Sequence, residues 1–195
     1  MCALPQRSTW TKEDYLAFER EQTDAKHELI DGEIYAMAGG SREHILITGA
    51  SYSSLFVQTA DRPCEVYQSE MKVYNRATGS FMYPDIAITC GEVEMDDNRR
   101  DILLNPTMII EVLSPSTADY DRGTKFNHYQ MIPSLREYVL IEQDKPEAEQ
   151  RTRQPDDTWL LRKLTGLAAV IDLQSIGCKL PLQDVYRKIT FGEGE

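Results

Sequence analysis

The chain has 195 residues, 41% of them hydrophobic and 27% charged, which is typical of a folded globular protein and excludes disorder as the dominant state. Its 21 Lys and Arg are outnumbered by 32 Asp and Glu, and the resulting net charge of −11 argues against tight, non-specific binding of DNA. An enzyme that contacts nucleic acid through metal ions and a local basic patch stays compatible with this charge.

The length of the chain and the absence of long apolar runs suggest its domain organisation and its cellular location. A length of 195 residues favours one domain over residues 1–195. No run approaches the roughly 18 apolar residues that span a bilayer, and MCALPQRSTW lacks the apolar core of a secretory signal. We therefore expect a cytoplasmic protein with no membrane partner.

The N-terminal third predicts a helix, a hairpin and a second helix. Thr11 is a good cap for a short surface helix over KEDYLAFERE, and Asp31-Gly32 is a strong turn signal within HELIDGEIYAMAGG. Glu28 and Glu33 flank that turn, where we expect them to be solvated. A longer helix should then begin after a second cap and run to about Thr59. Its cap is Ser41, its first turn holds His44, and its apolar residues at helical spacing are Ile45, Tyr52, Leu55 and Phe56.

The remaining elements alternate between strands and one helix. Strands are predicted over CEVYQS, MKVYN, FMYPDIAITC, PTMIIEVLSPS and LREYVLIEQ, with a polar excursion over 91–105 and a helix from Asp121 to Met131. A hairpin around QPDD and short elements near LPLQDVYRKI complete the chain. This order predicts an α/β fold with a mixed sheet flanked by helices, an N-terminal helix and hairpin, and a C-terminal hairpin extension.

The spacing of the four cysteines does not indicate a disulfide framework. Cys2, Cys64, Cys90 and Cys178 are widely spaced and form no CxxC pair, so we expect reduced thiols and no zinc site.

A carboxylate inside the most apolar strand is the strongest functional signal. Glu111 lies among Met108, Ile109, Ile110, Val112 and Leu113, and a carboxylate buried there without a partner would cost several kcal/mol. It must therefore be protonated, paired with a cation, or bound to a metal.

A second carboxylate has the same character. Asp85 follows Pro84, and strand alternation places it on one face with Ala87 and Thr89. Two acids on neighbouring strands suit a hard divalent ion such as Mg²⁺, whose shell is completed by water and substrate phosphate. Lys125, in the helix that follows the Glu111 strand, could reach the same place. Together these residues indicate phosphoryl chemistry.

These residues carry a family resemblance. Pro84-Asp85, Glu111 in IIEVLSPST, the run YDRGTKFNHYQMIPSLREYVLI and the hairpin KHELIDGEIYAMAGG with His44 resemble the Uma family, a restriction-endonuclease-like branch of the PD-(D/E)XK nuclease superfamily. The resemblance covers most of the chain and implies a nuclease fold with Asp85 and Glu111 as metal ligands. The E-x-K element would place lysine at the position of Leu113, so Lys125 is the expected substitute.

The function that the resemblance implies is Mg²⁺- or Mn²⁺-dependent hydrolysis of DNA phosphodiester bonds. In that mechanism the backbone carbonyl of Val112 joins Asp85 and Glu111 as a metal ligand, and Lys125 orients the nucleophile or stabilises the transition state. His44 or Glu28 supplies a further ligand or a proton relay. A homodimer would fit an enzyme that cuts both strands with two-fold symmetry.

Other interpretations stay open from the residues alone. Glu111 and Lys125 would also form a purely structural ion pair, and Asp85 would also suit a strand start. Lys125 has the exposed helix position that is the default for lysine, and His44 suits a hydrogen-bonding role at a helix start. At the level of function, the alternatives are a catalytically weak nucleic-acid-binding or regulatory protein on a nuclease scaffold, and a hydrolase of a smaller phosphoester.

Overall fold

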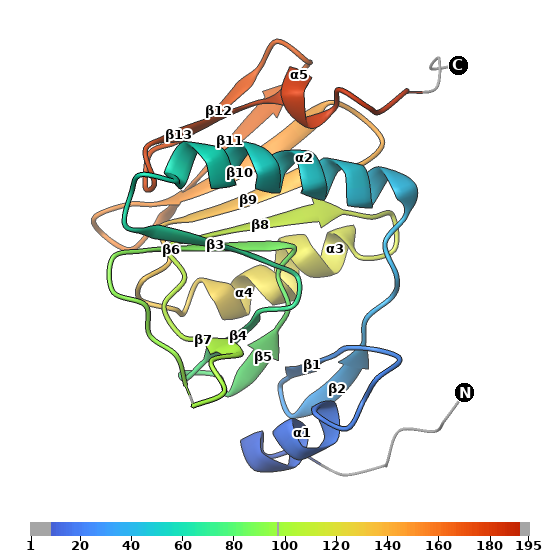
Figure 1. Ribbon diagram of the computed structural model, residues 1–195, viewed down its shortest axis with the longest axis vertical. Helices are drawn as coiled ribbons and strands as arrows, with labels where there is room; N and C mark the ends of the chain where they lie inside the picture. Colours follow the sequence, from blue (N-terminus) through green and yellow to red (C-terminus); the bar gives the residue numbers. More distant parts are fainter. Residues whose placement is uncertain (1–8, 97, 192–195) are drawn as a thin grey trace.

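Residues 9–96 and 98–191 are described by the computed structural model, which is built around a mixed six-stranded sheet (Figure 1). Its strand order is β11-β10-β9-β8-β6-β3, in which β8 and β9 run parallel and the other neighbours run antiparallel. The predicted mixed sheet is therefore confirmed. The strands are β3 (Cys64–Gln68), β6 (Ile86–Cys90), β8 (Met108–Leu113), β9 (Glu137–Glu142), β10 (Glu147–Arg153) and β11 (Trp159–Thr165).

A second sheet of five strands was not anticipated from the sequence. Its order is β2-β1-β5-β4-β7, so the predicted N-terminal hairpin forms one end of a larger sheet. Its strands are β1 (His27–Ile30), β2 (Glu33–Ala36), β4 (Lys72–Asn75), β5 (Ser80–Met82) and β7 (Ile102–Leu103). A separate hairpin near the C-terminus pairs β12 (Val170–Leu173) with β13 (Cys178–Pro181).

The two predicted N-terminal helices form where their caps are. Thr11 accepts a hydrogen bond from the Asp14 N–H at 3.1 Å at the start of α1 (Lys12–Glu19), and Ser41 accepts one from the His44 N–H at 3.1 Å at the start of α2 (Arg42–Thr59). The helical segment after β8 consists of α3 (Ala118–Tyr120), a π-helical turn η1 (Asp121–Lys125) and α4 (Phe126–Tyr129), and the last helix is α5 (Leu182–Val185).

The six-stranded sheet is covered on both faces (Figure 1). Helix α2 packs through Ile47 and Leu55 on one face, and the α3–α4 segment packs through Phe126 and Tyr129 on the other. Because side chains alternate along β8, Ile110 joins the first cluster and Ile109 the second. This two-sided burial is the reason why the strand reads as a continuous apolar run.

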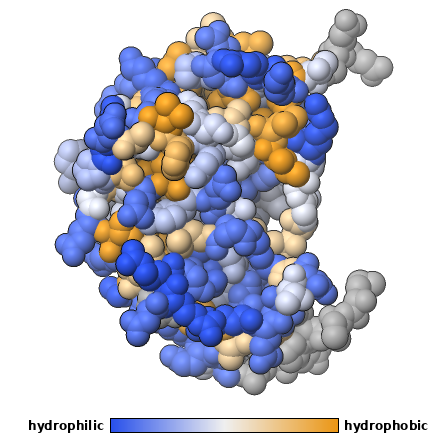
Figure 2. All heavy atoms as spheres, in the orientation of Figure 1, coloured by the Kyte–Doolittle hydropathy of each residue, from blue (hydrophilic) through white to orange (hydrophobic). Residues whose placement is uncertain are grey.

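Part of α2 remains uncovered. Of the four apolar residues at helical spacing, Leu55 is fully buried and Tyr52 partly buried, but Ile45 and Phe56 are 62% and 53% exposed. Figure 2 shows apolar side chains interrupting the polar surface over this helix. Within residues 9–96 and 98–191, none of the helices combines the length and the hydropathy needed to cross a bilayer.

The stretch FMYPDIAITC forms two strands instead of one. β5 ends at Met82 and β6 begins at Ile86, and the two strands belong to different sheets. Pro84 lies between them, where a residue without an N–H cannot continue a strand ladder. The residues 83–85 therefore carry the chain from one sheet to the other, and Asp85 stands directly before β6.

The expectation of four reduced thiols is wrong for one pair. Cys64 of β3 lies opposite Cys90 of β6 in the antiparallel register, and the two form a disulfide across 26 positions of sequence. Their spacing along the chain gives no sign of this because strand pairing, not sequence, brings them together. Cys178 is a buried free thiol, and Cys2 lies outside the described residues.

Candidate active site

The pairing of β6 with β8 places the two predicted acids side by side. Ile86 lies opposite Ile110, so Asp85, one residue earlier, comes opposite Glu111. Both acids lie on the sheet face that the α3–α4 segment covers, because Ala87 and Ile109 pack in that cluster. The Asp85 N–H donates a hydrogen bond to Glu111 Oε2 at 3.2 Å. The two carboxylates therefore share one face, as the prediction of a common site requires.

Asp85 is held by groups from two other elements. Its Oδ2 accepts a hydrogen bond from the Val112 N–H at 2.7 Å, and its Oδ1 lies 2.9 Å from His44 Nε2 in the first turn of α2. Burial disfavours the imidazolium, but the hydrogen bond and the charge of Asp85 outweigh it and raise the pKa of His44. His44 therefore does more than begin a helix, because its ring reaches the candidate site.

Lys125 lies in the site, and its side chain is not at the exposed position that is the default for lysine. The residue is only 4% exposed, and its amine lies 2.9 Å from Glu111 Oε1 and 3.1 Å from Glu28 Oε1. It also donates to the Tyr83 carbonyl at 3.2 Å, and Asp121 Oδ1 is 3.8 Å away. The structure thus brings the lysine to the same side as both acids.

Glu28 is buried at the centre of this cluster, so the expectation that it is solvated is wrong. It is 3% exposed, accepts a hydrogen bond from the Tyr83 N–H at 2.9 Å and another from the Tyr120 hydroxyl at 2.8 Å. The reason is the position of β1, which lies between β2 and β5 inside the second sheet. Glu33, on the edge strand β2, is exposed as expected.

Two members of the cluster were missed in the sequence. Asp121 lies four positions before Lys125, a helical spacing that could have signalled the contact. Tyr120 gave no comparable signal, because its partner Glu28 lies 92 positions away.

The electrostatics of the cluster are dominated by acids. Glu28, Glu111 and Asp121 surround the ammonium of Lys125, and Asp85 lies beside Glu111. Burial raises the pKa of Glu111 well above its usual value, and burial also raises the pKa of Asp121. Burial alone would lower the pKa of Lys125, but the nearby charges of Glu111 and Glu28 raise it instead. A site with this excess of carboxylates favours an additional cation.

The donor set fits Mg²⁺ with solvent in its shell. Glu111 Oε1 is buried, and no donor among the described residues is aligned with it for a hydrogen bond, although Lys125 is near. In the described part of the chain, no group of three or more His, Cys, Asp or Glu side chains is arranged to hold a metal ion. Mg²⁺ does not require such a group, because one or two carboxylates plus waters and substrate phosphate usually hold it. Asp85 and Glu111 are two adjacent carboxylates of the kind that such a site uses.

Comparison with known proteins shows which family the chain belongs to. A family model described as "Putative restriction endonuclease", Uma2, matches residues 12–183. The chain belongs to the Uma2 family. Two proteins of Synechocystis sp. are similar to it, "Uncharacterized protein slr1290" with 35% identity over 92% of each chain and "Uncharacterized protein sll1609" with 36% identity over 83% of this chain and 91% of the relative.

A solved structure has the same fold as this Uma2 protein. The crystal structure of a "putative nuclease belonging to DUF820" from Anabaena variabilis ATCC 29413 superposes with a TM-score of 0.76, covering 91% of this chain and 98% of the other at 17% identity. At that identity the likeness establishes the fold. The predicted restriction-endonuclease-like architecture of this Uma2 protein is therefore confirmed.

Proposed function

We propose that this Uma2 protein is an endonuclease that uses Mg²⁺ or Mn²⁺ to hydrolyse phosphodiester bonds of DNA. The observation that carries the proposal is the placement of Asp85 and Glu111 on one sheet face, with the Lys125 amine 2.9 Å from Glu111. The family description as a restriction endonuclease supports the reaction class.

Asp85 and Glu111 are the residues that would hold the metal, with the Val112 carbonyl and His44 beside them as further candidate ligands. When bound there, Mg²⁺ would supply an acidified water and would neutralise charge on the scissile phosphate. In the protein itself, His44 and the Val112 N–H fix the orientation of Asp85 through hydrogen bonds at 2.9 and 2.7 Å. These two contacts pre-organise the carboxylate before substrate arrives.

Lys125 contributes a positive charge in a nearly dry environment. Because its side chain is only 5% exposed, its field is screened less than that of a surface lysine. A cation at this position stabilises the charge that develops on the phosphate and on the attacking oxygen in the transition state. This is the role that the lysine of an E-x-K element would have at the position of Leu113.

A second candidate function is a catalytically weak nucleic-acid-binding or regulatory protein on the same scaffold. The observation that favours it is the number of protein groups that already engage Lys125: Glu28, Glu111, Asp121 and the Tyr83 carbonyl. These contacts of the Lys125 amine stabilise the folded protein whether or not the residue takes part in catalysis.

Cleavage of supercoiled plasmid and of single-stranded and branched DNA, at low salt with Mg²⁺ or Mn²⁺, tests the proposal. Asp85→Asn preserves the shape of the side chain and removes its charge, so cleavage should fall at least about 100-fold. Lys125→Ala should lower it comparably. Asp61→Asn removes an acid from an exposed position after α2 and is the matched control, with activity like that of the wild type.

Thermal denaturation of the same proteins separates the two candidates. Metal that binds only the folded state raises the melting temperature, and Asp85→Asn should abolish that gain. Metal-dependent stabilisation without cleavage of any DNA would refute the nuclease and favour the scaffold function.

A further inference from the structure

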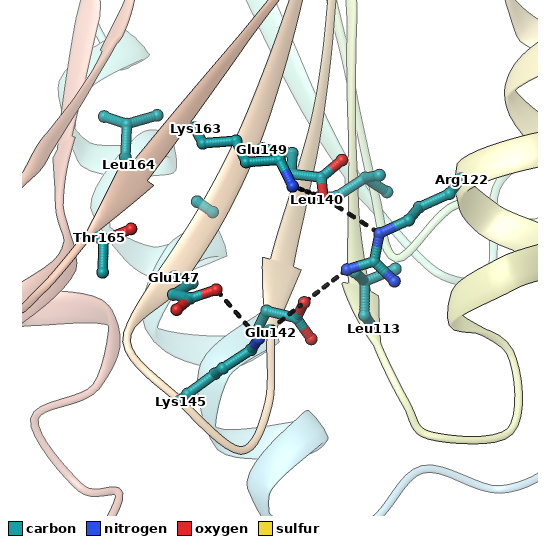
Figure 3. Close-up of a pocket in the computed structure, with 11 residues that line it drawn as sticks. Leu113, Arg122, Leu140, Glu142, Lys145, Glu147, Glu149, Lys163, Leu164 and Thr165 are labelled. Carbon is teal, nitrogen blue, oxygen red and sulfur yellow. Dashed lines mark hydrogen bonds and ion pairs between the residues drawn. The ribbon is translucent and has the colours of Figure 1, made fainter.

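A small hollow of about 170 Å³ lies on the six-stranded sheet, and Figure 3 shows the residues that line it. Leu113 of β8 and Leu140 of β9 form its apolar floor, and charged side chains form its rim. Ala148 of β10 and Leu164 of β11 border the hollow, but their side chains pack in the cluster on the opposite face of the sheet. A pocket that encloses a small organic ligand usually has roughly 300–1,000 Å³, so this hollow suits one charged group of a ligand held mainly elsewhere.

Cations from three different elements converge on the rim. Arg122 reaches in from η1, Lys145 from the turn between β9 and β10, and Lys163 from β11 (Figure 3). The side chains of Lys145 and Lys163 are 50% and 72% exposed, so both lysines can reorient without unfolding anything.

The acids on the rim are mainly engaged by Arg122. Its Nε lies 3.1 Å from Glu149 Oε1, and its Nη2 contacts Glu142. Lys163 is only loosely paired, at 3.7 Å from Glu149, and Lys145 lies 3.0 Å from Glu147. Arg151, outside the lining, lies 3.9 Å from Glu149. The lining itself has three cations and three carboxylates, in a chain whose net charge is −11.

The hollow lies next to the candidate active site, on the same face of the sheet as Asp85 and Glu111. Leu113 is two residues after Glu111 on β8 and faces the same side of the sheet. Arg122 is three residues before Lys125 in the same helical segment. From β8 the hollow extends across β9 and β10 to β11, and these three strand spacings correspond to about 14 Å.

We propose that this hollow is a second phosphate-binding subsite, at which Lys145 and Lys163 contact the backbone of a polynucleotide whose scissile phosphate is at Asp85 and Glu111. The inference rests on the proposed function and names its substrate class as a polymer. DNA carries one phosphate per roughly 3.4 Å of axis in each strand, so a strand bound at the acids has further phosphates within reach of the hollow. A small phosphoester has none.

Binding to a labelled oligonucleotide with Mg²⁺, in the Asp85→Asn background so that DNA stays intact, tests the subsite directly. Replacing both lysines by glutamine, Lys145→Gln with Lys163→Gln, removes two phosphate contacts. The affinity should fall about 10-fold near physiological salt, and the slope of log affinity against log salt should shrink by about 1–2. Arginine at both positions should preserve binding. Lys188→Gln is the matched control, because Lys188 lines a groove between α2 and α5 on the other side of the sheet.

Hydrolysis by the lysine variants in the otherwise wild-type protein tests the substrate class. The ratio of the rate on the oligonucleotide to the rate on bis-p-nitrophenyl phosphate should fall about 10-fold in the double glutamine variant. An unchanged ratio and an unchanged salt slope would overturn the subsite. Oligonucleotide binding that depends on both lysines, in a protein that hydrolyses neither substrate, would support the subsite and refute the proposed nuclease.

Discussion

At the scale of single residues, Glu28 links three parts of the candidate site. Its Oε1 lies 3.1 Å from the Lys125 amine and accepts the Tyr83 N–H, and its Oε2 accepts the Tyr120 hydroxyl. One carboxylate thereby joins the second sheet, the crossing between the sheets and the helical segment that carries Lys125. Removing it would take one of its acids from Lys125 and would leave the Tyr83 N–H and the Tyr120 hydroxyl without this acceptor.

Glu28→Ala should therefore destabilise the protein strongly. Breaking a buried ion pair by removing one partner typically costs about 3–5 kcal/mol, and Lys125 retains Glu111, so we expect roughly 3 kcal/mol. Urea denaturation should show a lower midpoint with an unchanged slope. Glu33→Ala, on the exposed side of the same hairpin, should change the free energy of unfolding by less than about 0.5 kcal/mol. Equal effects of the two variants would contradict this account of Glu28.

At the scale of elements, the start of α2 determines where His44 lies. Ser41 accepts the His44 N–H at 3.1 Å and also donates a hydrogen bond to Gln143 Oε1 at 3.0 Å. The cap thus fixes the first turn of the helix against the loop that follows β9. The His44 ring then meets Asp85 at the sheet.

Ser41→Ala should cost about 1 kcal/mol of stability through the lost cap, with a range of roughly 0.5–2 kcal/mol. The matched control is Ser53→Ala in the middle of the same helix, where the hydroxyl donates to the Gly49 carbonyl at 2.8 Å. Because alanine is the better helix former, that change should be neutral or stabilise the protein by a few tenths of a kcal/mol. Urea melts of both variants distinguish a cap effect from a general effect of losing a hydroxyl.

At the scale of the whole molecule, sequence patterns predicted the features that depend on neighbouring residues in the chain. The caps Thr11 and Ser41, the Asp31-Gly32 turn and the apolar run around Glu111 each act within a few residues, and the structure has the corresponding elements. The contact of Glu111 with Lys125 was also accessible, because a buried acid requires a partner and the next helix supplied one.

The contacts that escaped prediction depend on strand pairing between distant segments. The burial of Glu28 follows from the pairing of β1 with β5, and its contact with Tyr120 spans 92 positions. The disulfide depends likewise on the alignment of β3 with β6. Register between such strands is set by the whole core, so no spacing rule along the chain reveals it.

The disulfide between Cys64 and Cys90 gives a prediction about the stability of the whole domain. It closes a loop across 26 positions, from the edge strand β3 to β6, so it restricts the unfolded chain. For a loop of this length the chain-entropy model gives about 3.5 kcal/mol. Cys64→Ala with Cys90→Ala should therefore lower the free energy of unfolding by roughly 2–4 kcal/mol.

Reductant provides the matched control for that variant. It should lower the melting temperature of the wild type by roughly 5–10 °C, as expected for this loss in a domain of this size, and leave the melting temperature of the double variant unchanged. Alkylation of the unfolded wild type should label Cys64 and Cys90 only after reduction. Labelling of both thiols without reductant would show that Cys64 and Cys90 are reduced thiols and form no disulfide. In that case the alignment of β3 with β6 would depend on backbone pairing alone.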